Sequence, residues 1–109
     1  GDSGGGGVPL NGCTTYLDRT AAGAVRTIPW DFPVATAPER CMKIKKGQTV
    51  TFDGSLTIHP LLDSGGDSPN PIGSSDATAT GKASFASAGT FGFVCGLHPN
   101  MTGAITVVE

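Results

Sequence analysis

The chain consists of short runs of valine, isoleucine, phenylalanine and threonine, and each run ends at glycine, proline, asparagine or aspartate. Runs of this kind favour β-strands, and the residues between them favour turns. The 17 glycines and the scarcity of helix-favouring stretches agree with this pattern. The sequence therefore predicts an all-β protein, either a sandwich or a barrel.

A chain of 109 residues is long enough for one modest hydrophobic core. We expect a single domain over residues 9–109, preceded by a flexible glycine-rich tether over residues 1–8. The formal net charge is −2, and the one basic group, formed by Lys43, Lys45 and Lys46, is small, which argues against nucleic-acid binding. The sequence contains no apolar stretch of membrane-spanning length.

Four side chains carry atoms that bind soft metal ions. Cys95, His98 and Met101 follow an apolar run closely, and His59 is the other histidine of the chain. Two imidazoles, one thiolate and a weak axial thioether are the donors of a type 1 copper site. Structural zinc sites favour paired cysteines without a thioether, so copper is favoured over zinc. The sequence predicts one copper ion bound by His59, Cys95, His98 and Met101.

These residues also resemble a known family. The pattern Cys95-x-x-His98-x-x-Met101, followed by Gly103 and an apolar run to Val108, resembles the copper-binding hairpin of the cupredoxins. The two-residue gap between histidine and methionine is most similar to amicyanin, whereas plastocyanins usually have a longer gap. The segment Lys-Gly-Gln-Thr-Val-Thr-Phe before His59 resembles the strand that leads to the first histidine in the same family.

The resemblance implies a Greek-key sandwich of about seven to eight strands and a monomeric electron-transfer protein rather than an enzyme. Electrons would leave through the exposed edge of His98 to redox proteins that dock transiently. An apolar patch of Pro60, Leu61, Leu97 and Pro99 would surround that edge. The same ligands could serve copper storage or delivery, which is the alternative function, and a metal-free adhesion or structural sandwich is a third interpretation.

The sequence departs from the family beside the ligands. In typical cupredoxins the residue after the first histidine donates its backbone N–H to the cysteine sulfur, but here it is Pro60, which has no N–H. In amicyanin and plastocyanin a proline precedes the second histidine, but here it is Leu97, which has an N–H. We therefore predict that this hydrogen bond to the sulfur comes from Leu97, and such contacts tune redox behaviour.

Three cysteines are present, and a ligand role for Cys95 leaves Cys13 and Cys41. A disulfide between them is favoured over two separate buried thiols, and it requires an oxidising compartment. We therefore expect a periplasmic or extracellular protein. Contact with a membrane is expected only through an anchor before the tether.

Local patterns predict the remaining elements. Residues 26–34 contain two prolines and suit an edge strand, with Trp30 serving only in packing. A hairpin turn at Asp53 and Gly54 is expected to lead into a strand over residues 56–61. In that strand His59 shares its face with Thr57, so either a bulge shifts the register or Thr57 faces inward.

The next part of the chain is polar and rich in glycine. Residues 63–77 are expected to form a long surface loop, and residues 78–85 a strand with an interruption at Gly81. Two further strands, over residues 90–94 and 102–108, are expected to pair and to flank the ligand loop.

Overall fold

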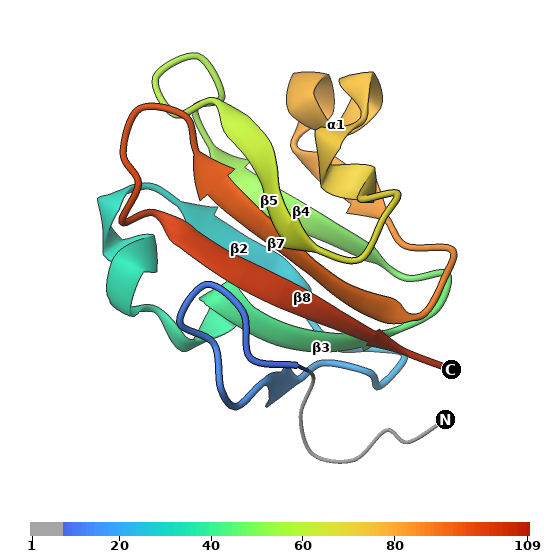
Figure 1. The fold of residues 1–109 in the computed structure, drawn as a ribbon. Helices are drawn as coiled ribbons and strands as arrows, with labels where there is room; N and C mark the ends of the chain where they lie inside the picture. The colour runs from blue at the N-terminus through green and yellow to red at the C-terminus, as the bar shows by residue number, and fades with distance from the viewer. Residues whose placement is uncertain (1–7) are drawn as a thin grey trace.

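The computed structural model describes residues 8–109, which form eight strands in two sheets and little helix (Figure 1). The strands are β1 (Leu17–Asp18), β2 (Thr27–Trp30), β3 (Cys41–Lys45), β4 (Thr49–Gly54), β5 (Leu61–Gly66), β6 (Lys82–Ser84), β7 (Gly89–Cys95) and β8 (Thr102–Val108). One sheet has the order β1-β3-β8-β7-β5 and the other has the order β2-β4-β6. The predicted all-β class is therefore confirmed.

The hydrophobic core joins residues of both sheets. Phe93 on β7 contacts Trp30 on β2 and Phe52 on β4 edge-on, with ring centroids 5.7 and 4.9 Å apart. Strands β7 and β8 pair antiparallel, with Phe91 opposite Ile105. The two strands predicted to flank the ligand loop are therefore confirmed as neighbours, and their apolar side chains lie in the core.

The hairpin predicted at Asp53 and Gly54 is wrong. Strand β4 continues through Gly54, which pairs with Trp30 at the end of β2. The backbones are so close there that a Cβ on Gly54 would collide with the Trp30 carbonyl group. The chain then crosses to the other sheet, because β5 pairs with β7 and not with β4. The edge strand predicted within residues 26–34 is confirmed as β2.

The strand predicted over residues 56–61 is also wrong, because β5 begins only at Leu61. Before it, the His59 N–H donates a 2.9 Å hydrogen bond to the Ser55 carbonyl oxygen, which closes a turn. The alternation of side chains along a strand does not apply in a turn. Thr57 is exposed although His59 is buried, and neither a bulge nor an inward Thr57 is needed.

The surface loop predicted over residues 63–77 contains more structure than expected. It begins within β5 and includes a 3₁₀ turn (η3, Pro71–Gly73) and the start of helix α1 (Ser75–Thr80). The Ser74 hydroxyl accepts a hydrogen bond from the Ala77 N–H and caps α1, and Gly81 ends the helix with a positive φ of 75°. The strand predicted over residues 78–85 is therefore shortened to β6.

The predicted disulfide between Cys13 and Cys41 is confirmed. It ties the segment before β1 to the first residue of β3, beside a small buried cluster that contains Tyr16 and Ala104. A disulfide indicates an oxidising compartment. In residues 8–109, no helix combines the length and the hydropathy needed to cross a membrane. The predicted tether lies outside the described residues except for Val8, which is exposed.

Candidate metal centre

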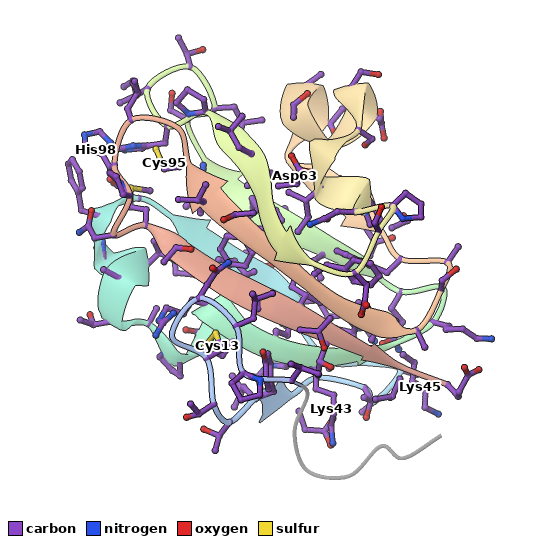
Figure 2. The ribbon with its side chains drawn as sticks, viewed as in Figure 1. Cys13, Lys43, Lys45, Asp63, Cys95 and His98 are labelled. Carbon is purple, nitrogen blue, oxygen red and sulfur yellow. A yellow bond between two sulfur atoms is a disulfide. The ribbon has the colours of Figure 1, made fainter. Side chains whose placement is uncertain are left out.

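Three of the four predicted ligands converge at one end of the sandwich. The Nδ1 atoms of His59 and His98 are 3.2 Å apart, and the Cys95 sulfur lies 3.7 Å from each of them. Figure 2 shows Cys95 and His98 together at this end, far from Lys43 and Lys45. The three donor atoms therefore form a small triangle, and both imidazoles present the same ring nitrogen to its centre.

A tight loop positions Cys95 and His98. Cys95 is the last residue of β7, and its N–H donates to the carbonyl oxygen of Met101 over 2.9 Å. The Met101 N–H in turn donates to the carbonyl oxygen of His98, also over 2.9 Å. These two bonds close the loop between β7 and β8, so the spacing Cys-x-x-His places both side chains on one side of it.

His59 is held beside Cys95 by main-chain contacts although the two residues are 36 apart in sequence. Leu61, the first residue of β5, pairs with Cys95. The Gly96 N–H donates a 2.8 Å hydrogen bond to the Pro60 carbonyl oxygen. The Trp30 indole donates another, also 2.8 Å long, to the His59 carbonyl oxygen. The backbone around His59 is thus fixed to the ligand loop and, through Trp30, to the other sheet.

The three donors differ in their access to solvent. Cys95 and His59 keep only 2% and 4% of their surface exposed, whereas His98 is half-buried. A buried thiol is protected from oxidants and from exchange with other thiols. Of the three donors, His98 is therefore the one that reaches the surface.

The spacing of the donors fits a single metal ion. With nitrogen bonds of about 2.0 Å and a sulfur bond of about 2.3 Å, an ion in the plane of the donors separates the nitrogens by about 3.5 Å and each nitrogen from sulfur by about 3.7 Å. The observed separations of 3.2 and 3.7 Å are close to these values. Among the described residues, His59, Cys95 and His98 form the group that could hold a metal ion.

The fourth predicted ligand, Met101, is fully buried and belongs to the same core cluster as Cys95. The backbone bond between the two residues keeps their main chains adjacent. Met42, the other methionine, is fully buried on β3 and belongs to the hydrophobic core.

The predicted apolar patch needs one correction, because Leu61 is only 1% exposed and packs in the core. Leu97 and Pro99 are exposed, and Pro60 is half-buried. The predicted surface also lacks an important member. The Phe32 ring, which is 56% exposed, contacts the rings of His59 and His98 edge-on at centroid distances of 5.1 and 4.8 Å.

Sequence reasoning missed the contribution of residues 30–32. Trp30 does more than pack, because its indole hydrogen-bonds the His59 carbonyl oxygen, and Asp31 and Phe32 contact the imidazoles. Asp31 caps a 3₁₀ helix, η1 (Phe32–Thr36), that carries a proline in its first turn. Aspartate followed by proline signals this helix start, but the spatial proximity to His59 follows from the packing of the sheets.

Comparison of the chain with family models, with curated proteins and with solved structures finds no match.

Proposed function

We propose that this chain is a type 1 copper electron-transfer protein of the cupredoxin family, most similar to the amicyanin and plastocyanin group, with a Greek-key sandwich. The observation that carries the proposal is the triangle of donor atoms from His59, Cys95 and His98. Two imidazoles and one thiolate in a trigonal arrangement are typical of sites that exchange single electrons through copper.

Each ligand has a distinct role in this proposal. His59 and His98 would hold the copper ion through Nδ1, and Cys95 would hold it through its thiolate. Met101 would be the fourth, weaker donor, and its burial in the same core cluster as Cys95 supports this role. A thiolate and a thioether are soft ligands that select copper, whereas structural zinc sites favour paired cysteines.

When bound, copper supplies a one-electron couple between Cu(II) and Cu(I). The protein holds the donors in place, because main-chain hydrogen bonds fix both ligand loops in the folded chain. Burial of Cys95 excludes water from the sulfur. A fixed ligand geometry suits both oxidation states of copper, and it keeps the reorganisation energy of electron transfer small.

His98 is half-buried and is the donor of the triangle that reaches the surface, so we expect electrons to pass to a partner protein through its ring. Leu97 is 64% exposed and stands beside it in sequence, with Pro99 on the other side. A small apolar surface of this kind suits the weak encounters of redox proteins. The lysines of β3 lie away from His98 (Figure 2), so they are not part of this docking surface.

The proposal also covers the location of the protein, its oligomeric state and whether it is an enzyme. The disulfide supports a periplasmic or extracellular location. We propose a monomer that is not an enzyme. A multicopper oxidase needs further histidines, and the chain has only His59 and His98.

Titration of the apoprotein with one equivalent of Cu(II) tests the proposal. We expect an intense visible thiolate-to-copper band and the narrow copper hyperfine splitting of a type 1 site in the EPR spectrum. Cys95→Ser should abolish the band. A colourless product with an ordinary Cu(II) EPR spectrum would contradict the proposal.

The two methionines provide a matched pair for the axial role. Met101→Leu should change the EPR spectrum and raise the reduction potential, because a thioether donor is lost. Met42→Leu, an equally buried substitution on β3, should change neither. If the copper site forms but releases copper to a chelator within seconds and shows no reversible redox wave, the storage or delivery alternative is favoured.

A further inference from the structure

A carboxylate lies against the side of His59 that faces away from the donor triangle. Asp31 Oδ1 is 3.3 Å from His59 Nε2, whereas His59 Nδ1 faces Cys95 and His98. The Asp31 side chain is 67% exposed and that of His59 only 5%. The imidazole thus lies between an acidic group on one side and the candidate metal position on the other.

The position of Asp31 is fixed by the fold. It is the residue after β2 and the N-cap of η1, and its Oδ1 accepts a 2.7 Å hydrogen bond from the Phe32 N–H. The same oxygen faces His59 Nε2. The separation of 3.3 Å is slightly longer than most N–H···O hydrogen bonds.

We propose that Asp31 is a positioning residue that keeps the proton of His59 on Nε2 and leaves the Nδ1 lone pair directed at the metal. A neutral imidazole carries its proton on one nitrogen, and the partner of the other nitrogen selects which. Carboxylates that accept the remote N–H of a ligating histidine also raise its basicity as a ligand. Asp31 therefore favours the more highly charged Cu(II) state and lowers the reduction potential.

The contact between the two histidines extends the inference to the metal-free protein. The Nδ1 atoms are 3.2 Å apart, which is within hydrogen-bond distance, so without a metal ion one of them can donate a hydrogen bond to the other. If Asp31 keeps the His59 proton on Nε2, His59 Nδ1 accepts and His98 Nδ1 donates. The two imidazoles should therefore be opposite tautomers in the apoprotein, and metal binding requires His98 alone to move its proton from Nδ1.

Nitrogen-15 NMR of the apoprotein, under conditions where both imidazoles are neutral, tests the tautomers without any metal. We expect His59 as the Nε2–H form and His98 as the Nδ1–H form. Asp31→Ala removes the acceptor and should increase the Nδ1–H fraction of His59. An unchanged His59 tautomer in this variant would overturn the proposal.

Asp31→Asn tests the charge, because an asparagine still caps η1 but carries no negative charge. We expect a higher reduction potential and an affinity for Cu(II) that is about ten- to a hundred-fold weaker, measured by competition with a chelator. Asp76→Asn, which removes one exposed carboxylate in the first turn of α1, is the control and should change neither. If Asp31→Asn behaves like Asp76→Asn in both measurements, the effect on the metal is refuted.

The redox part of this inference rests on the proposed function, and the NMR part does not. A wild-type protein without the thiolate-to-copper band would refute the copper function, while the apoprotein tautomers would still decide whether Asp31 directs His59. Should Asp31→Ala fail to fold, the tautomer of His59 in Asp31→Asn decides the point, because a neutral amide is a weaker acceptor and should also raise the Nδ1–H fraction.

Discussion

The Trp30 indole donates a buried hydrogen bond of 2.8 Å to the His59 carbonyl oxygen. This bond joins the end of β2, in the three-stranded sheet, to the turn that precedes β5 in the other sheet. Because Trp30 also packs against Phe52 and Phe93, the ligand turn is fastened directly to the aromatic centre of the core.

Trp30→Phe should therefore affect stability and metal binding together. Loss of the buried hydrogen bond and of part of the indole volume should lower the free energy of unfolding by about 2–4 kcal/mol. The affinity for Cu(II) should fall as well, because the His59 turn loosens. Urea unfolding and chelator competition measure the two effects. Phe85→Leu, at another fully buried core position, should lower stability but leave the affinity of the folded protein unchanged.

The sequence predicts a hydrogen bond from the Leu97 N–H to the Cys95 sulfur, but in the structure the hydrogen-bond partners of the sulfur are the Nδ1 atoms of His59 and His98. Leu97→Pro tests whether the predicted bond forms when copper is bound. An N–H donor draws electron density from the thiolate and weakens its bond to Cu(II) more than to Cu(I). Removing the donor should therefore lower the reduction potential, measured by voltammetry. Leu97→Ala keeps the backbone N–H, so its reduction potential should not fall in this way. An unchanged potential in Leu97→Pro, with copper still bound, would refute the hydrogen bond.

The disulfide should matter for stability and not for the metal. It closes a loop between residues 28 apart in sequence, so replacing Cys13 and Cys41 together by serine should lower the free energy of unfolding by about 3 kcal/mol. The copper spectrum of the folded variant should not change, because Cys13 belongs to a buried cluster separate from that of Cys95. A shifted spectrum would show that the clusters are coupled.

Glycine at position 54 is required by the close approach of β2 and β4. An added Cβ would collide with the Trp30 carbonyl group, so Gly54→Ala should lower the free energy of unfolding by about 1–3 kcal/mol. Gly23 has open space around its Cβ position and no positive φ, which makes Gly23→Ala the matched control. Equal unfolding midpoints for the two variants would contradict this account of the strand contact.

Asp18 should make stability depend on acid pH. Its carboxylate accepts hydrogen bonds from the Thr20 hydroxyl and N–H, at 2.7 and 2.9 Å, and these bonds lower its pKa below the ordinary 3.8, with a smaller contribution from Lys43. Because the pKa of Asp18 is lower in the folded protein, its ionised carboxylate stabilises the fold at pH values above the ordinary pKa. This stability is lost as the pH falls through the lowered pKa. Asp18→Asn should therefore melt below the wild type at about pH 6, and the difference should shrink as the pH falls below the ordinary pKa of 3.8. Asp53→Asn, at another exposed carboxylate, is the control.

The sequence alone predicted the features that depend on residues close together in the chain or on the small number of histidines and cysteines. Cys95 and His98 share one short loop, so their spacing alone brings them together. His59 is the one other histidine, and Cys13 and Cys41 are the cysteines that remain. The structure brings His59, Cys95 and His98 together, joins Cys13 to Cys41 and pairs β7 with β8.

The errors came where a local pattern had more than one structural meaning. Residues 56–61 alternate like a strand, but hydrogen bonds to Ser55 close them into a turn. Asp53 and Gly54 look like a hairpin turn, but Gly54 is required within β4 by its contact with β2. The roles of Trp30 and Asp31 depend on contacts with His59, far along the chain, and no local pattern predicts these.

The pairing of Leu61 with Cys95 has a consequence for how the chain meets a metal ion. In the unfolded chain only Cys95 and His98 are near each other, and the second imidazole arrives when β5 docks on β7. A tightly bound ion therefore selects the native conformation over the denatured ensemble. Loading with metal should raise the melting temperature by mass action, so a bound ion would also stabilise the tertiary structure of the protein.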